Sequence, residues 1–231
     1  MSKYINIAID GHSSCGKSTI SKSISKQYNM RYIDTGSMYR AITLYCIENN
    51  LFLTDNQPNE ELIIKHLPNI DVNFVYHIDS YTSTTYLNGD NVEDKIRGIA
   101  VSSSVSLVAR LAAVRKKLIE LQQNIAREKN VVMDGRDIGT KVLPLAELKF
   151  FITADVEVRA KRRYDELIHT KHEISYSEVL ENLKERDRND SNRLINPLRV
   201  ADDAILIDNS TINFLDQNRL IFNYIDKSLT V

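Results

Sequence analysis

Short apolar runs alternate along this chain with segments whose apolar positions recur every three or four residues. Five of the runs are rich in β-branched and aromatic residues and predict buried strands, because such side chains favour a pleated backbone. These runs lie at residues 4–9, 31–34, 131–134, 148–152 and 204–207. The alternation of such runs with helical segments predicts an α/β fold, a doubly wound parallel sheet of about five strands with helices on both faces.

Segments with helical spacing occupy much of the remaining chain. We expect helices from residue 18 to about 28 and at 36–49, 60–66, 94 to about 128 and 211–229. Another helix should begin at Ser175, because Ser175 and Glu178 form the sequence pattern of a capping box. Ile174 and Val179 are placed to form the apolar contact that accompanies such a start.

Residues 71–76 and 84–90 have a different pattern. Polar and apolar positions alternate in both segments, which predicts antiparallel strands with one exposed face. The first predicted strand, in contrast, is apolar almost throughout, as expected for a strand with both faces covered. We therefore interpret the two alternating segments as a hairpin inserted into the parallel α/β body.

The most informative motif follows the first predicted strand and reads G-x-x-x-x-G-K-S. With the next residue it comprises Gly11, His12, Ser13, Ser14, Cys15, Gly16, Lys17, Ser18 and Thr19. Glycines let successive backbone N–H groups point at phosphate oxygens, and the following helix adds the positive end of its dipole. Lys17 can reach the outer phosphates, and the Ser18 hydroxyl can bind Mg²⁺. A chance glycine pair in a surface turn is the alternative, but the order strand, loop, helix favours an ATP-binding phosphate loop.

Composition narrows the class of protein. A net charge of −1 argues against a general nucleic-acid binder, which usually has a basic face. Two cysteines, Cys15 and Cys46, offer neither a disulfide framework nor a metal-binding spacing, and no apolar run approaches the roughly 18 residues of a membrane span. We expect a cytoplasmic monomer whose partners are small molecules, not nucleic acid or membrane. The guanine-reading string N-K-x-D does not occur and no two glycines are adjacent, which argues against GTPases and transporter-type ATPases.

Arginines recur beside predicted strand ends and at helical spacing in the second half of the chain. They are Arg40 and Arg136, then Arg159, Arg162 and Arg163, then Arg186 and Arg193. Arginines that converge on a phosphate site suit phosphoryl transfer, whose catalysis consists mostly of positioning and charge neutralisation. The alternative is a surface on which these arginines pair with neighbouring carboxylates.

The chain resembles the bacterial cytidylate kinases, a family of nucleoside-monophosphate kinases among the P-loop kinases. Its most specific string is D-G-R-D-I-G-T at residues 134–140, and the resemblance includes D-T-G-S-M-Y-R at 34–40 and R-D-R-N-D-S-N-R at 186–193. It covers nearly the whole length. It implies transfer of the γ-phosphate of ATP to CMP and dCMP with Mg²⁺, in pyrimidine nucleotide metabolism.

The resemblance implies a single P-loop kinase domain with three kinds of region. The core would comprise residues 1–36, 100–155 and 194–231. A monophosphate-binding insertion would extend over about 37–99, and a helical lid over about 156–193. His12 and Cys15 depart from the residues usual in the family, proline and a small residue, at positions that mainly present backbone.

The resemblance also implies roles for single residues. The catalytic residues that neutralise the transferred phosphoryl group would be Lys17, Arg159 and Arg163. The residues that bind the monophosphate would be Thr35, Arg40, Ser106, Arg115, Arg136, Asp137, Arg186, Asp190 and Arg193. In this set Arg40 and Arg136 would bind the phosphate, and Arg186 and Asp190 the sugar. The base would lie among Ser106, Arg115, Asp137 and Arg193. Mg²⁺ would be held by Ser18 and by Asp134, directly or through water.

The chemistry of cytosine agrees with these roles. Its exocyclic amine donates to a carboxylate such as Asp137, and its N3 and O2 accept from an arginine such as Arg115; uracil reverses the first two groups. Two alternatives stay open. One is a kinase of the same fold for another small substrate, such as UMP, AMP or shikimate, and the other is a nucleotide-sensing module without turnover.

Overall fold

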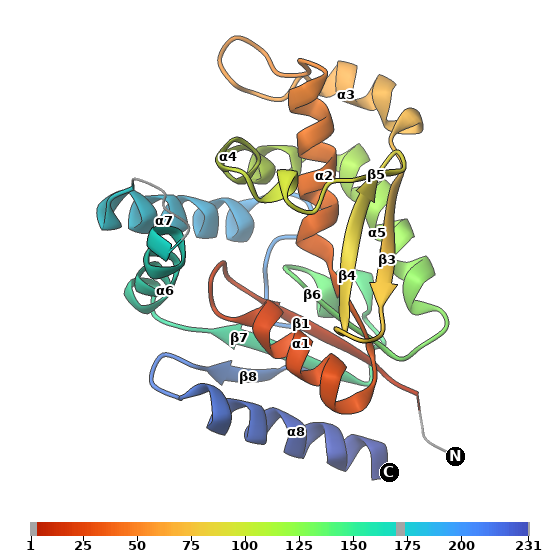
Figure 1. Ribbon diagram of the computed structural model, residues 1–231, viewed down its shortest axis with the longest axis vertical. Helices are drawn as coiled ribbons and strands as arrows, with labels where there is room; N and C mark the ends of the chain where they lie inside the picture. Colours follow the sequence, from red (N-terminus) through yellow and green to blue (C-terminus); the bar gives the residue numbers. More distant parts are fainter. Residues whose placement is uncertain (1–3, 170–173, 231) are drawn as a thin grey trace.

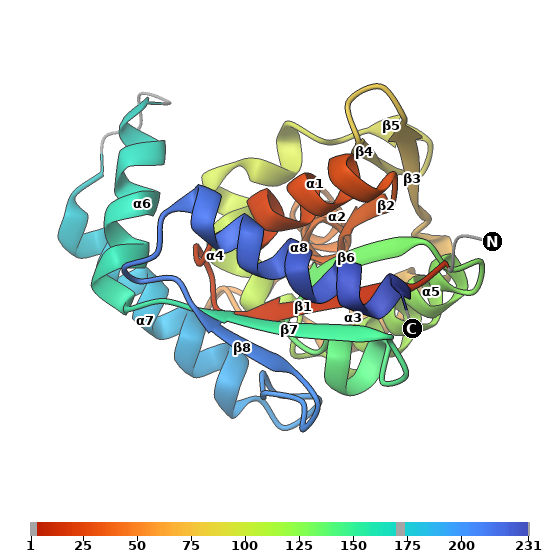
Figure 2. The same ribbon diagram turned by 90° about the horizontal axis from the view of Figure 1, so that it is seen from below.

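Five parallel strands form the central sheet in the order β2-β6-β1-β7-β8 (Figures 1 and 2). The computed structural model describes residues 4–169 and 174–230, so residues 1–3 and 231 of the predicted core and 170–173 of the predicted lid lie outside it. The strands are β1 (Asn6–Gly11), β2 (Arg31–Asp34), β6 (Val131–Gly135), β7 (Leu148–Thr153) and β8 (Ile205–Asp208). Each begins and ends within two residues of a predicted run, and the predicted α/β class is confirmed.

Alternate residues of β1 face two separate apolar cores. Ile7 and Ile9 are fully buried in the core that α1 (Lys17–Tyr28) and α8 (Phe214–Thr230) complete on one face of the sheet (Figure 2). Ala8 faces the other core, which includes residues of α2 (Thr35–Glu48), α4 (Ile99–Val108) and α5 (Ala112–Ala126). Burying one isoleucine side chain contributes about 1.5–3 kcal/mol, so both faces of this central strand stabilise the sheet.

A second, antiparallel sheet confirms the predicted hairpin. It consists of β3 (Val72–His77), β4 (Thr82–Leu87) and β5 (Asp90–Asn91) in that order. The short helix predicted at 60–66 is α3 (Glu60–His66), followed by the 3₁₀ turn η1 (Leu67–Asn69). The helical region predicted at 94–128 contains the 3₁₀ turn η2 (Lys95–Arg97), α4 and α5, and it is divided before α5 because Leu111 adopts an extended backbone.

Helices α6 (Val156–His169) and α7 (Tyr176–Asn192) pack against each other beside the carboxyl ends of the strands (Figure 1). The predicted capping box is confirmed: the Glu178 backbone N–H donates to the Ser175 hydroxyl, and the Ser175 N–H donates to the Glu178 carboxylate. Ala160, Val179 and Leu183 form a small apolar core of their own between the helices. In residues 4–169 and 174–230, no helix is both long enough and apolar enough to cross a membrane.

A buried carboxylate joins β1 to the turn that follows β6. Asp10 accepts the backbone N–H groups of Ile138 and Gly139 at 2.8 and 2.7 Å. Both residues belong to η3 (Ile138–Val142), a π-helical turn. Burial raises the pKa of Asp10 to about 6, although the two backbone hydrogen bonds oppose the change. Asp10 therefore sets where the two residues that precede this turn, Arg136 and Asp137, leave the sheet.

We expect Asp10→Asn to remove part of the pH dependence of stability. Because the folded pKa of about 6 exceeds the ordinary value of 3.8, the proton binds the folded protein more tightly. The contribution of Asp10 is thus fully present below pH 4 and is lost as the pH rises through 6. The unfolding free energy of the wild type should fall by about 2–2.5 kcal/mol relative to Asp10→Asn between pH 4 and 7. Urea unfolding at several pH values measures it, and a constant difference would contradict the assignment. The exposed Asp202→Asn is the matched control.

Candidate active site

A cleft of about 490 Å³ opens at the carboxyl ends of the parallel strands, where α/β sheets bind ligands. The phosphate loop, the start of α2, the end of β6 and parts of α4, α6 and α7 line it. Every residue predicted to bind the monophosphate lines this cleft, as does the phosphate loop apart from Gly11, His12 and Cys15. The fold therefore brings together residues that are far apart in the sequence.

The three loop residues that do not line the cleft, Gly11, His12 and Cys15, make contacts that support the conformation of the loop. A Cβ on Gly11 would lie 2.0 Å from the Ile152 carbonyl oxygen, so only glycine fits where the loop leaves β1. The ring of His12 packs edge-on against Phe151, and the buried Cys15 thiol donates to the His12 carbonyl at 3.0 Å. These two departures from the family pattern are thus accommodated on the protein side of the loop.

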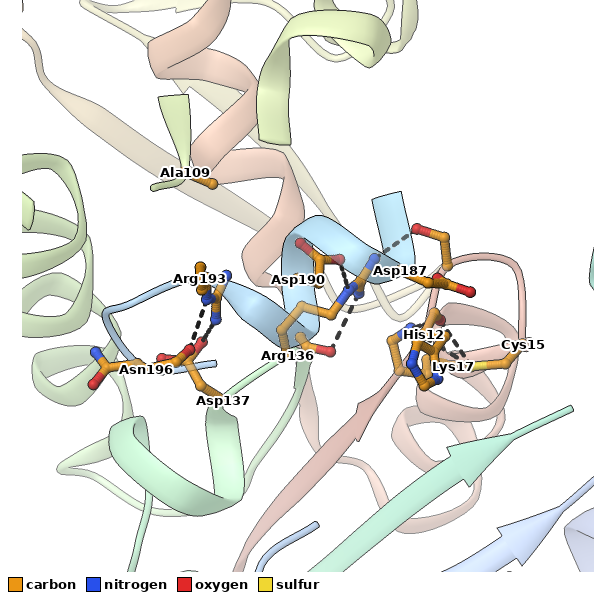
Figure 3. Close-up of polar contacts among 12 residues, drawn as sticks. His12, Cys15, Lys17, Ala109, Arg136, Asp137, Asp187, Asp190, Arg193 and Asn196 are labelled. Atoms are coloured by element: carbon orange, nitrogen blue, oxygen red, sulfur yellow. Dashed lines mark hydrogen bonds and ion pairs between the residues drawn. The ribbon is translucent and has the colours of Figure 1, made fainter. Parts of the chain in front are cut away.

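Lys17 begins α1 and lies at the base of the cleft. Its ammonium donates to the His12 carbonyl at 2.5 Å, which folds the side chain back over its own loop (Figure 3). Burial, and then the charge of Arg136, lowers the pKa of Lys17. A cation in these surroundings is disfavoured unless an anion joins it, so the position is suited to phosphate oxygens.

Arg136 connects the end of β6 to α7 and to the phosphate loop. Its Nε donates to Asp190 at 2.7 Å and its Nη2 to the Ser13 hydroxyl at 2.8 Å (Figure 3). Burial alone would raise the pKa of Asp190, but Arg136 holds it below its ordinary value. In this conformation the predicted phosphate ligand Arg136 and the predicted sugar ligand Asp190 are therefore bound to each other.

Asp137 lies between two arginines. One carboxylate oxygen pairs with Arg115, and the other accepts from Arg193 Nη2 at 3.2 Å. Arg115 is 1% exposed, and its guanidinium carbon lies 5.4 Å from the centre of the Tyr39 ring. Each carboxylate oxygen keeps a further lone pair, so Asp137 can still accept from a ligand amine. The structure thus brings together three of the four residues predicted around the base, and the fourth, Ser106, lines the same cleft.

Arg40 and Arg186 contribute positive charge that the protein does not fully neutralise. The Nε atoms of both are buried without a hydrogen-bond partner among the described residues. Arg40 lies 4.0 Å from the nearest oxygen of Asp34, a long ion pair. Burial and the nearby charge of Arg136 lower the pKa of Arg186 to about 10, and burial likewise lowers that of Arg40. This part of the cleft is a candidate anion site.

Ser18 and Asp134 are adjacent, as a shared metal role requires. The Ser18 hydroxyl donates to one oxygen of Asp134 at 3.0 Å, and the Tyr32 phenol donates to the other at 3.0 Å. Thr35, which was predicted to contact the monophosphate, donates its hydroxyl to the Asp134 backbone carbonyl at 2.7 Å. Burial, and then the charge of Asp34, raises the pKa of Asp134 to about 6, so a cation here would stabilise its ionised form.

The two oxygen donors fit Mg²⁺, which uses few protein ligands and completes its shell with phosphates and water. Among the described residues, no group of three or more His, Cys, Asp and Glu side chains could hold a metal ion alone.

Arg159 and Arg163 lie one turn apart on α6 but occupy different surroundings. Arg163 lines the cleft and pairs with Glu166 at 2.8 Å. Arg159 is 5% exposed and does not line the cleft. It donates to Asp187 on α7 at 2.7 Å and to the Ser13 carbonyl at 3.3 Å. The shared phosphate contact expected for the two arginines stays a prediction.

Comparisons with known proteins identify the family. A family model described as cytidylate kinase matches residues 7–227. A cytidylate kinase of Bacteroides fragilis is 47% identical over 227 residues, covering 98% of this chain and 99% of that one. One of Parabacteroides distasonis is 50% identical over the same length and the same shares.

The chain belongs to the cytidylate kinase family. A solved structure of an uncharacterized protein from Eubacterium ventriosum is similar in fold, with a TM-score of 0.50, 13% identity and coverage of 97% of this chain and 99% of that one. Membership agrees with the D-G-R-D-I-G-T string, whose arginine and second aspartate both face the cleft.

Arg97 of this cytidylate kinase site was not predicted from the sequence. It lines the cleft from the insertion, pairing with Glu93 and lying 3.9 Å from Asp34. No local motif marks Arg97, because it reaches the cleft through the packing of its own segment. Arg162, which the sequence placed among the converging arginines without a role of its own, lines the cleft from α6.

We expect Arg186→Met to stabilise the free protein while weakening its response to CMP. The substitution removes a half-buried cation that neighbouring arginines repel, so the melting temperature should rise by about 2–4 °C, equivalent to about 1 kcal/mol. The further rise that saturating CMP causes in the wild type should shrink. Differential scanning fluorimetry with and without CMP measures both. Arg188→Met, exposed on the same helix, is the control; a free variant that melts lower would contradict the repulsion.

Proposed function

We propose that this member of the cytidylate kinase family transfers the γ-phosphate of ATP to CMP and dCMP, giving ADP with CDP or dCDP. The observation that carries the proposal is the placement of Asp137 between Arg115 and Arg193, in a cleft that also contains the phosphate loop. The two ion pairs join a carboxylate acceptor to guanidinium donors, and this combination of groups supports recognition of a cytosine edge. The close similarity to curated cytidylate kinases supports the same activity.

The distribution of charged residues in the cleft supports separate binding positions for ATP and for CMP. ATP phosphates bind the loop around Lys17, whose lowered pKa reflects a buried cation without an anion. The phosphate of CMP binds Arg40 and Arg136. Arg186 and Asp190 bind the sugar hydroxyls, for which Asp190 must share its carboxylate with Arg136.

The reaction needs no covalent enzyme intermediate. An oxygen of the CMP phosphate attacks the γ-phosphorus of ATP in line, and the bond to the β–γ bridging oxygen breaks as ADP leaves. The attacking phosphate is ionised at neutral pH, so the protein does not need a general base. Lys17, Arg159 and Arg163 neutralise charge on the transferred group. Bound with ATP at Ser18 and Asp134, Mg²⁺ would supply further neutralisation of the phosphates.

We infer that α6 and α7 form a lid over the nucleotides, in a cytoplasmic, monomeric enzyme of pyrimidine nucleotide metabolism. The two helices pack mainly on each other through their own small core. Their links to the phosphate loop and β6 are polar, through Arg159 and Arg136. Polar links can re-form on a different partner, and closure would exclude water from the reacting phosphoryl group.

A coupled assay of ADP release with CMP, dCMP, UMP and AMP, and with shikimate, tests the proposal. Turnover highest with the cytosine nucleotides is expected. Preference for UMP, AMP or shikimate would indicate a different kinase of this fold. Nucleotide binding without ADP release would indicate a sensing module.

We expect Lys17→Ala to lower kcat by about 10²–10³-fold, the usual cost of removing one donor to developing charge. The variant should remain folded, because the ammonium contacts only its own loop. Steady-state kinetics with CMP and circular dichroism measure the two effects. The control is Lys26→Ala, an exposed lysine of the same helix. A folded Lys17→Ala enzyme with normal kcat would overturn the assignment of the phosphate loop.

We expect Asp137→Asn to reduce the preference for CMP over UMP. One acceptor oxygen becomes an amide donor, which can face the uracil carbonyl, so the preference should shrink by about 1–3 kcal/mol. Most of the change should come from poorer use of CMP, because Arg115 still donates to cytosine N3. The ratio of kcat/KM for the two nucleotides measures it. An unchanged ratio with lower activity would make Asp137 a structural anchor for its two arginines.

A further inference from the structure

Asn209, the residue after β8, is 3% exposed and connects three separate elements. Its side-chain amide donates to the Cys15 carbonyl of the phosphate loop at 2.8 Å and to Gln217 of α8 at 2.6 Å. Its side-chain oxygen accepts from Arg162 of α6 at 3.0 Å. The side chain thus uses both of its N–H donors and its acceptor oxygen within the protein.

The contact with Cys15 orients a peptide unit of the phosphate loop. In a planar trans peptide the C=O and N–H groups point in opposite directions. Because the Cys15 carbonyl is held by Asn209, the Gly16 N–H of the same peptide unit points the other way. Gly16 lines the cleft and has a φ of 86°, a left-handed backbone conformation that favours glycine over residues with a side chain. Asn209 therefore sets the direction of the backbone N–H of Gly16, a residue that lines the cleft.

The contact with Arg162 fixes a cation at the edge of the same cleft. Arg162 Nη1 binds the Asn209 side chain, and Nη2 binds the Asn209 backbone carbonyl at 2.9 Å. Two parallel bonds from a planar guanidinium hold its direction as well as its position. Arg162 is exposed and lines the cleft. The two hydrogen bonds to Asn209 therefore fix the conformation of a long side chain that would otherwise be free in solvent.

We propose that Asn209 is a positioning residue for ATP, which couples the phosphate loop to Arg162 of α6. It acts through the Cys15–Gly16 peptide and through Arg162 and does not touch the reacting atoms. The inference rests on the proposed function in one respect, that ATP occupies the phosphate loop. It assigns to Asn209 an effect on ATP but not on CMP, because the hydrogen bonds of its side chain go to Cys15, Arg162 and Gln217 and not to Asp137 or its two arginines.

Asn209→Asp separates the two contacts. The carboxylate keeps an acceptor for Arg162 but replaces the donor with an oxygen that faces the Cys15 carbonyl and Gln217. We expect ATP affinity measured by calorimetry to fall about tenfold, as for one lost hydrogen bond of about 1.4 kcal/mol. KM for ATP should rise by a similar factor, while KM for CMP stays within about twofold. The control is Asn223→Asp, the same change at an exposed position of α8.

Asn209→Ser is the second variant, in case the aspartate prevents folding. It shortens the side chain without adding charge, and the same separation between ATP and CMP is expected. Equal changes in both KM values, or unchanged ATP affinity in a folded variant of either kind, would overturn the proposal. The calorimetric measurement needs no acceptor. A wild type that does not phosphorylate CMP would overturn the proposed function alone, and ATP affinity would still decide the role of Asn209.

Discussion

Buried carboxylates hold the arginines of this cleft in place before any nucleotide binds. Guanidinium groups repel one another, and removing them from water is costly, so a cluster of them needs carboxylates at fixed positions. Asp137 pairs with Arg115 and Arg193, and Asp190 pairs with Arg136. Such pairs contribute little net stability, but removing one partner leaves the other as an unpaired buried charge, which is destabilising. The directions in which the arginine N–H groups point into the cleft therefore depend on their ion pairs with Asp137 and Asp190.

The pairing is incomplete, and the imbalance has a consequence for binding. Arg40 and Arg186 have lowered pKa values and buried Nε atoms without partners among the described residues. If the phosphate of CMP binds at Arg40 as proposed, its charge would relieve this repulsion, and part of the binding free energy would come from the electrostatically unfavourable free state.

The phosphate loop depends on side-chain contacts to its carbonyl groups as much as on its glycines, and two of the three contacts come from outside the loop. Lys17 holds the carbonyl of His12, Arg159 that of Ser13, and Asn209 that of Cys15. These donors come from α1, α6 and the end of β8. Each carbonyl so held turns the N–H of its peptide unit the other way. The loop and α6 are thus connected through side chains, which gives a physical route from the nucleotide to the proposed lid.

Most of the fold could be predicted, because the patterns that indicate its strands and helices involve residues close together in the sequence. The apolar runs and helical periods place all five parallel strands, the hairpin and the capping box at Ser175, since strand and helix patterns depend on neighbouring residues. Strand β5 was not predicted, because two residues carry no period. The family motifs also indicated which residues line the cleft.

The partners of those residues could not be predicted. The pairing of Arg136 with Asp190 joins residues that are 54 positions apart in the sequence. The contacts of Ser13 with Arg136 and with Arg159 join residues that are 123 and 146 positions apart. Residue type and spacing are properties of the chain, and they determined the strands, the phosphate loop and the set of charged candidates. Which arginine pairs with which carboxylate depends on distances in the folded protein, because the Coulomb energy of a pair depends on its separation and its burial. The local sequence determines neither quantity.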